Sequence, residues 1–220
     1  MRRIALSMIL LCLAVPGAQA QNSFGGPPPA VTSPGTPQTQ PPASSPAQGK
    51  APNAGAAHDA LGQAERQDFG VPPKKELHAG EMHGPTPASI PGGQVITTQG
   101  LVDLRGKQAR ALVFDVLGGP ETLPGALPAV PAHRPGAFDD ATQREFGQFL
   151  QQVTQGQKDT PLVFYCQSTQ CWMSYNASLR AIRLGYTQVL WYRGGLEAWK
   201  RAGQSVQAAR GAGTAQGPAR

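Results

Sequence analysis

The stretch "PLVFYCQSTQCWMSYNASLRAIRLGYTQVLWYRGG", residues 161–195, contains the pattern that decides the fold. Two short apolar runs enclose a segment with helical periodicity that ends at Gly185. Because parallel strands need a long crossover connection, usually a helix, we expect a strand–helix–strand unit here. Cys166 follows the first strand directly, and Cys171 precedes the helix. Ligands bind beyond the carboxyl ends of the strands in such a sheet, so both thiols fall where a functional site is expected.

The sequence on either side of this stretch continues the alternation of strand and helix patterns. Strands are predicted at 94–98, 111–117, 161–165 and 188–192. Helices are predicted at 99–106, after a cap at Asp139 or Asp140, after the cysteines, and at 194–203. Strands separated by helices indicate a mainly parallel sheet with helices on both faces. We therefore predict one α/β domain over residues 85–203.

The two ends of the chain differ from this domain in composition. Residues 1–20 combine a basic start, an apolar run and an "AQA" ending, which predicts a signal peptide cleaved before Gln21. Export predicts a periplasmic protein, and we expect no membrane anchor after cleavage. Residues 21–84 are rich in Pro, Gly and Ala and predict a disordered linker, with room for one short helix in 58–84. Residues 204–220 predict a disordered tail.

The charge and cysteine content restrict the classes of partner. The net charge is +6 at pH 7, and Arg2 and Arg3 in the predicted signal peptide contribute to it. The other basic residues form no arginine- or lysine-rich run, so nucleic acid is not an expected partner. The charge favours small anions or acidic partners only weakly. Removal of Cys12 with the signal peptide leaves Cys166 and Cys171 in a compartment where disulfides persist.

The loop between these two cysteines favours a reactive thiol. It has no bulky aliphatic side chain, so its backbone N–H groups can curl around a sulfur atom. The following helix points its positive end at the same place, which favours the thiolate of Cys166, and the thiolate is the nucleophile. Trp172 is a candidate for the mouth of a pocket, and Arg193 is a candidate to attract an anionic substrate. The candidate substrate-binding residues are therefore Gln167, Ser168, Thr169, Gln170, Trp172 and Arg193.

Three other readings of the cysteines remain open from the residues alone. Cys166 can be an inert core residue at the end of a strand. A Cys166–Cys171 disulfide is feasible if the Cα atoms come within ~7 Å, and it would be either a redox pair or a structural staple. A zinc site would need two more ligands. The histidines His78, His83 and His133 lack ligand spacing, so we predict no metal site.

The order of several motifs resembles rhodanese-like domains over roughly residues 90–203. The matching features are the strand "ALVFDV" with Asp115, the turn "LPGALPAVP" at 123–131, the cysteine loop and its helix, and "LWYRGGLEAW" with Gly194, Gly195 and Trp199. The resemblance implies transfer of sulfane sulfur, carried as a persulfide on Cys166, from a small sulfur donor or a protein thiol. It implies no cofactor.

The loop departs from that family at two positions. Cys171 stands where many members have arginine, and Trp172 stands where a small hydroxyl residue is common. The loop thus lacks a cation for thiosulfate, so weak thiosulfate activity is expected. Related dual-specificity phosphatases need arginine at the position of Trp172, so we do not expect phosphate-ester hydrolysis.

A narrower resemblance links the chain to exported rhodanese-like proteins with a CW motif. Some of these are CxxCW-motif proteins associated with pyrroloquinoline quinone-dependent catabolism, whereas four residues separate the cysteines here. We carry over no quinone cofactor. Two alternatives to sulfur transfer stay open: a periplasmic thiol–disulfide redox protein that uses Cys166 and Cys171, and a catalytically silent module that binds a periplasmic protein partner.

Overall fold

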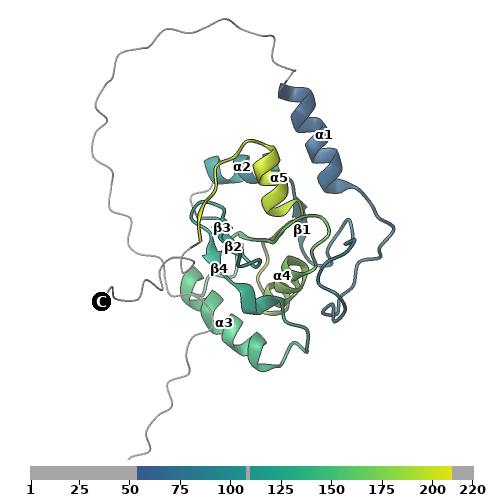
Figure 1. Cartoon of the computed structure of the whole chain (residues 1–220). Coiled ribbons are helices and arrows are strands. Elements are labelled where there is room, and N and C mark those ends of the chain that lie inside the picture. The colour runs from purple at the N-terminus through teal and green to yellow at the C-terminus, as the bar shows by residue number, and fades with distance from the viewer. Residues whose placement is uncertain (1–53, 108–109, 210–220) are drawn as a thin grey trace, which may run out of the picture.

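The computed structural model describes residues 54–107 and 110–209 of the 220-residue chain (Figure 1). The predicted signal peptide, residues 21–53 of the predicted linker and residues 210–220 of the predicted tail lie outside the described residues. Across the described ranges, every helix is too short or too polar to cross a membrane.

A five-stranded parallel sheet forms the centre of the domain, in the order β1-β6-β5-β2-β4. The strands are β1 (Gln94–Ile96), β2 (Leu112–Asp115), β4 (Leu127–Pro128), β5 (Leu162–Tyr165) and β6 (Val189–Tyr192). Every neighbouring pair in this sheet is parallel, so the prediction of a mainly parallel α/β domain is confirmed. The almost continuous apolar sequence of β2 and β5 reflects burial on both faces.

Helices cover both faces of the sheet (Figure 1). One face carries α2 (Thr98–Lys107) and α5 (Gly195–Arg201), and the other carries α3 (Ala141–Thr154) and α4 (Met173–Arg183). Alternate residues of β5 divide between two cores, because successive side chains of a strand point to opposite faces. Phe164 and Cys166 belong to the core under α3 and α4, and Tyr165 belongs to the core under α2 and α5.

The long Pro/Gly loop after β2 contains short elements that the sequence pattern does not predict. These are β3 (Glu121–Thr122), β4 and the 3-10 helix η1 (Val130–His133). Strand β7 (Gln207–Ala208) lies in the predicted tail and pairs antiparallel with β3. Elements of two to four residues are too short to show a hydrophobic period, which is why pattern reading misses them.

Over residues 54–84 the structure differs from the disordered linker that the sequence predicts. Helix α1 (Ala54–Arg66) contacts α2 and α5, and residues 67–90, here called the covering segment, run across the cysteine loop. The composition indicates too little apolar surface to fold. Long-range hydrogen bonds attach the covering segment, and Val71, Leu77 and Met82 also pack against a buried aromatic cluster. Lys74 N–H donates to Tyr175 Oη at 2.9 Å, and His78 N–H donates to Asn176 Oδ1 at 2.8 Å.

Candidate active site

Cys166 lies at the carboxyl end of β5, next to the centre of the parallel sheet. Its side chain points toward α4, and its sulfur is bonded to the sulfur of Cys171 as a disulfide. The two Cα atoms are 6.4 Å apart, within the range that a disulfide requires. Both cysteines are 1% exposed, so the structure describes an oxidised and occluded pair.

The immediate contacts of the Cys166 sulfur come from α4 and from the end of the loop. Its Sγ atom lies 3.1 Å from Ser174 Oγ and 3.3 Å from the carbonyl oxygen of Cys171. Within the described ranges, no backbone N–H of the loop donates to this sulfur. The amide cradle expected from the sequence is therefore not formed around the disulfide.

The covering segment pairs with the cysteine loop through the backbone. Gly84 N–H donates to Gln170 O at 2.8 Å, and Trp172 N–H donates to Met82 O at 2.9 Å. These bonds flank an antiparallel bridge between His83 and Cys171. The Thr86 hydroxyl also donates to the carbonyl oxygen of Thr169, at 2.6 Å. The loop carbonyls are thus directed at the covering segment, which closes this side of the site.

Trp172 lies beneath the covering segment and not at an open pocket mouth. Its side chain is 5% exposed, and its ring stacks on His78 with the ring centroids 4.1 Å apart. It also meets the edge of Tyr175, which belongs to the same buried aromatic cluster as Trp191. The aromatic surface that the sequence offers to a substrate is used within the chain to hold residues 67–90.

Arg193 binds the protein itself, which corrects its prediction as an anion-attracting residue. The side chain is 1% exposed and donates to the carbonyl oxygens of Glu65, Gln67 and Thr86, and to the Thr86 hydroxyl. Burial lowers the pKa of its guanidinium from the ordinary value. With its donors used on backbone carbonyls, the guanidinium anchors both ends of the chain that crosses the loop.

The glycine pair Gly194–Gly195 seats α5 against the backbone of the cysteine loop. Leu196 N–H donates to Cys166 O at 2.9 Å, and Glu197 N–H donates to Gln167 O at 3.0 Å. Gly195 has a φ of +62°, and a Cβ atom there would overlap the carbonyl oxygen of Cys166. Only glycine therefore permits this close approach without distortion.

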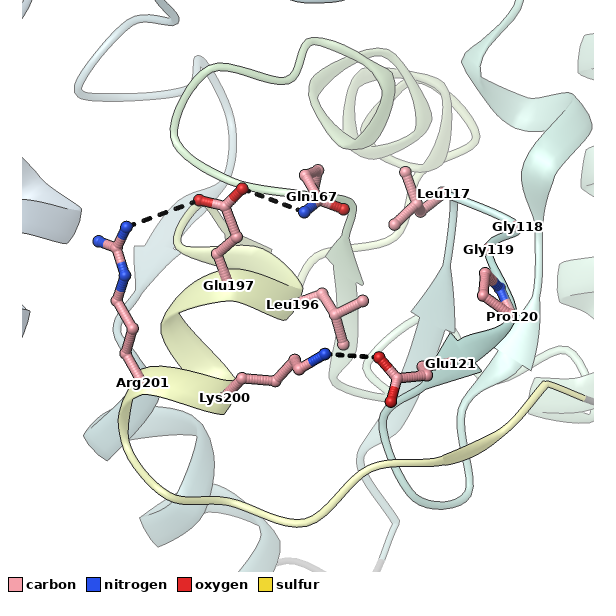
Figure 2. A pocket seen from close by; sticks show the side chains of 10 residues that line it. All are labelled: Leu117, Gly118, Gly119, Pro120, Glu121, Gln167, Leu196, Glu197, Lys200 and Arg201. Atoms are coloured by element: carbon pink, nitrogen blue, oxygen red, sulfur yellow. Dashed lines mark hydrogen bonds and ion pairs between the residues drawn. The ribbon is translucent and has the colours of Figure 1, made fainter.

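An open cavity of about 550 Å³ lies on the α5 side of the same sheet edge, between α5 and the loop that links β2 to β3. Figure 2 shows Gln167 beside Glu197, and the Lys200–Glu121 ion pair crossing between the two elements. Gln167 is the member of the cysteine loop that lines this cavity, and neither cysteine lines it. Ser168 and Thr169 are partly exposed and Gln170 is exposed.

The remaining candidate groups have structural partners or stand apart. The buried Asp115 carboxylate accepts the N–H groups of Leu117 and Gly118, at 2.8 and 3.1 Å, and so shapes the β2–β3 turn. In the part of the chain that the structure describes, no three His, Cys, Asp or Glu side chains gather as a metal site would require. Sequence reasoning missed Ser174 and Trp191. No motif marks them, because α4 brings Ser174 to the sulfur and β6 brings Trp191 to Ser174.

Comparison with known proteins agrees with this arrangement. Residues 92–202 match the family model described as the rhodanese-like domain. A comparison with curated protein sequences finds no significant match.

Solved structures with the same kind of domain are distant in sequence. A thiosulfate sulfurtransferase from Pseudomonas aeruginosa is 17% identical, with a TM-score of 0.40, over 54% of this chain and 21% of that chain. This chain thus spans about a fifth of the length of that enzyme. A human single-domain sulfurtransferase is 26% identical, with a TM-score of 0.34, over 48% of this chain and 94% of its own. A rhodanese-like domain from Anabaena is 16% identical, with a TM-score of 0.39, over 57% and 86% of the two chains.

The family model covers half of the chain and includes the whole parallel sheet, the cysteine loop and the glycine pair. The chain belongs to the rhodanese-like domain family.

Proposed function

We propose that the protein is an exported sulfurtransferase that carries sulfane sulfur as a persulfide on Cys166. The observation that carries the proposal is the place of Cys166 at the carboxyl end of the central strand β5, where a loop and the N-terminus of α4 follow it in a rhodanese-like sheet. Proteins with related domains include sulfurtransferases by name. The disulfide with Cys171 is then the resting, oxidised form.

The transfer step requires the reduced protein. A protein dithiol first reduces the Cys166–Cys171 disulfide, giving two thiols on this chain and a disulfide on the reductant. The Cys166 thiolate then attacks the outer sulfur of a persulfide donor, R–S–S–H. A bond forms between that sulfur and Cys166 Sγ, the S–S bond of the donor breaks, and R–S⁻ leaves with the electron pair of that bond. The proton stays on the transferred sulfur, which an acceptor thiolate takes up in the same way.

Cys171 provides a second route out of the persulfide. Its thiolate can attack Cys166 Sγ, expelling the carried sulfur as HS⁻ and restoring the disulfide that the structure contains. The Cα separation of 6.4 Å allows this closure. Cys171 therefore tunes how long the persulfide lasts, while Cys166 carries it.

The charge around the site favours a weakly charged donor. Residues 166–172 contain no lysine or arginine, and the Arg193 guanidinium is committed to backbone carbonyls. A thiosulfate dianion would lose water without gaining a cationic partner at the loop. We propose a small persulfide or a protein thiol as the exchange partner, and weak turnover of thiosulfate.

The test uses the reduced full-length mature protein and a small persulfide. Mass spectrometry should find one added sulfur atom on the peptide that contains Cys166, and turnover to an acceptor thiol should follow. Cys166→Ser should lose both signals, whereas Cys171→Ser should retain them and hold the persulfide longer. Retained turnover in Cys166→Ser would exclude the persulfide mechanism. So would the absence of added sulfur on Cys166 in both the wild type and Cys171→Ser.

The bonded sulfurs favour a second candidate, thiol–disulfide exchange with a partner protein. This candidate needs both cysteines, because the disulfide is the group exchanged. Cys171→Ser separates the two functions: sulfur transfer should survive this change, and net oxidation or reduction of a dithiol substrate should not. If Cys171→Ser loses sulfur transfer, and the wild type oxidises or reduces a dithiol substrate without forming a persulfide, the redox function is favoured.

The compartment and subtype belong to the same proposal. The pattern of residues 1–20 supports export, and a periplasmic location would suit the disulfide. The "CW" pair at 171–172 supports a relation to the exported CW-motif proteins. N-terminal sequencing of protein from a periplasmic extract should give Gln21 first; the full-length chain in the cytoplasmic fraction would contradict export.

A further inference from the structure

We propose that Ser174 is a positioning residue that, together with Trp191, stabilises negative charge on Cys166 Sγ in preference to Cys171 Sγ. This inference rests on the proposed function, because it explains which of the two sulfurs becomes the nucleophile. It starts from the hydrogen-bonded chain Trp191–Ser174–Cys166, with heavy-atom distances of 3.0 Å and 3.1 Å.

The direction of this chain follows from the donor inventory of its members. The indole N–H of Trp191 can only donate, so the Ser174 hydroxyl oxygen must accept from it. The single hydroxyl hydrogen of Ser174 is then free to point at the sulfur. A disulfide sulfur has no hydrogen and can only accept. The hydrogen bond between Ser174 and Cys166 therefore runs from the hydroxyl to Sγ.

The two donor side chains, Ser174 and Trp191, are held in place and shielded from solvent. Ser174 is 1% exposed and Trp191 is 0% exposed. Trp191 is held within β6, where it pairs with Phe164 of β5, and its ring meets the edge of Tyr175 at 5.0 Å. Ser174 lies in the first turn of α4. A hydrogen bond to a charged group is stronger in such surroundings than in water, because no solvent competes for the donor.

The two sulfurs are unequal as a result. Among the hydrogen bonds of the described residues, Cys171 Sγ accepts none, whereas Cys166 Sγ accepts one from the Ser174 hydroxyl. When an attacking thiolate R–S⁻ bonds to Cys171 Sγ, the Sγ–Sγ bond breaks and its electron pair remains on Cys166 Sγ. The charge thus develops where the hydroxyl already points, and no proton is needed in that step. After full reduction, Cys166 is the more acidic thiol.

The experiment measures thiol acidity in the reduced protein without any sulfur donor. The Cys171→Ser background leaves Cys166 as the single thiol of the mature chain, and its thiolate absorbance in the ultraviolet is followed against pH. Adding Ser174→Ala should raise the pKa of Cys166 by about one unit, since a hydrogen bond to a charged group is lost. Trp191→Phe keeps an aromatic ring but removes the indole N–H, and should shift the pKa in the same direction by less, because the Ser174 hydroxyl is then free to turn.

Ser178→Ala is the matched control. Ser178 is also buried in α4, but its hydroxyl donates to the carbonyl oxygen of Ser174 and does not reach the sulfur. It should leave the pKa of Cys166 unchanged. With both cysteines present, Ser174→Ala should also shift the equilibrium with a dithiol about tenfold toward the disulfide, because the reduced form has lost its stabilised thiolate.

The inference would be overturned if the pKa of Cys166 in Ser174→Ala equalled that in Ser178→Ala. It would also be overturned if neither Trp191→Phe nor Ser174→Ala changed the pKa of Cys166. Ser174→Thr keeps a hydroxyl and should restore the wild-type pKa, which separates the hydrogen bond from packing. The readout does not depend on sulfur transfer. An inactive wild type with the expected pKa shifts would contradict the proposed function alone, and active proteins without the shifts would contradict this inference alone.

Discussion

The two sides of the carboxyl edge of the sheet are closed in different ways. On the α4 side, the cysteines lie under residues 67–90, and hydrogen bonds from Arg193 and the loop backbone fasten that segment down. On the α5 side, a cavity of about 550 Å³ is open, and its charged side chains pair across it (Figure 2). The two cysteines are on the closed side, and the accessible space is on the other.

The alternation of side chains along β5 explains this separation. Tyr165 points to the α5 side and Cys166 points to the α4 side. The sulfur of Cys166 therefore lies on the side of the sheet away from the cavity, while the backbone carbonyl of Cys166 accepts a hydrogen bond from α5. Access to the sulfur therefore depends on the covering segment, whereas the open cavity is lined by Gln167 of the cysteine loop and by neither cysteine. Changes on the closed side should alter cysteine chemistry, and changes on the open side should alter mainly local stability.

The largest effect is expected when the covering segment loses its anchor. Arg193→Met removes a buried cation that satisfies three backbone carbonyls and a hydroxyl, so the free energy of unfolding should fall by about 4 kcal/mol. A small thiol should also reduce the Cys166–Cys171 disulfide faster. Chemical denaturation and the rate of thiol release measure the two effects.

Arg201→Met is the control for this change. Arg201 is an exposed arginine of α5 whose ion pair with Glu197 spans 4.0 Å. It should change neither stability nor the reduction rate. Equal reduction rates in Arg193→Met and the wild type would show that the covering segment does not limit access to the disulfide.

The next largest effect is expected where the two sides share a backbone. Gly195→Ala would place a methyl group against the Cys166 carbonyl at a φ of +62°, and should cost about 3 kcal/mol in the free energy of unfolding. Gly203→Ala has a similar φ, +70°, with open space around the added Cβ, and should cost about 1 kcal/mol. Denaturation curves of both variants give the difference, and equal costs would exclude a steric contribution at Gly195.

A smaller, pH-dependent effect is expected at Glu65, which attaches α1. Burial raises the pKa of this carboxyl above 4.5, although hydrogen bonds from Thr98 act in the opposite direction. A raised pKa means that the folded state favours the protonated acid. The stabilising contribution is complete below the unfolded value of about 4.5 and is lost as pH rises through the folded value. Hydrogen-exchange protection of α1 should therefore decrease with rising pH, and Glu65→Gln should remove this dependence.

The pKa of Asp140 is shifted in the opposite direction to that of Glu65, so its contribution to stability depends on pH with the opposite sign. Partial burial acts to raise its pKa, but hydrogen bonds from Arg180 and from the Gln143 amide outweigh it and lower the pKa below 3.8. Its contribution is present above that unfolded value and is lost as pH falls through the folded value. In Asp140→Asn the acid-side loss of stability should be smaller than in the wild type. Parallel pH profiles for Asp140→Asn and Glu65→Gln would contradict both assignments.

The smallest effect is expected in the open cavity. The Lys200–Glu121 ion pair has a distance of 2.5 Å, but its side chains are 50% and 44% exposed. Solvent screens such pairs, so Lys200→Met should change the free energy of unfolding by less than about 0.5 kcal/mol. It should leave the rate of disulfide reduction unchanged. A faster reduction rate in Lys200→Met would show that the cavity side does control access to the sulfur.

The strong periodic segments made the central architecture predictable. The strands at β2, β5 and β6 and the helices α3 and α4 are long or apolar enough to show their period, and the parallel order follows from their alternation. The position of Cys166 at a strand end follows from the same reading. The order of motifs also indicated the family before any distance was known.

Local periodicity did not predict the covering segment. It also did not predict the contacts of Trp172 and Arg193. Trp172 and Arg193 have side chains suited to a ligand. Only the fold shows that the ring of His78 stacks on Trp172 and that Arg193 donates to the carbonyl oxygens of Glu65, Gln67 and Thr86. Those contacts join residues about a hundred positions apart, and local sequence carries no signal for such pairings.

The sequence by itself therefore determined the parallel α/β domain and the thiol at the end of its central strand, because both depend on local periodicity and chain order. Only the tertiary structure decided that the thiol is bonded to Cys171, hydrogen-bonded by Ser174 and covered by residues 67–90. These properties depend on distances between segments that are remote in the chain. Physical proximity in the fold sets them, and residue order does not.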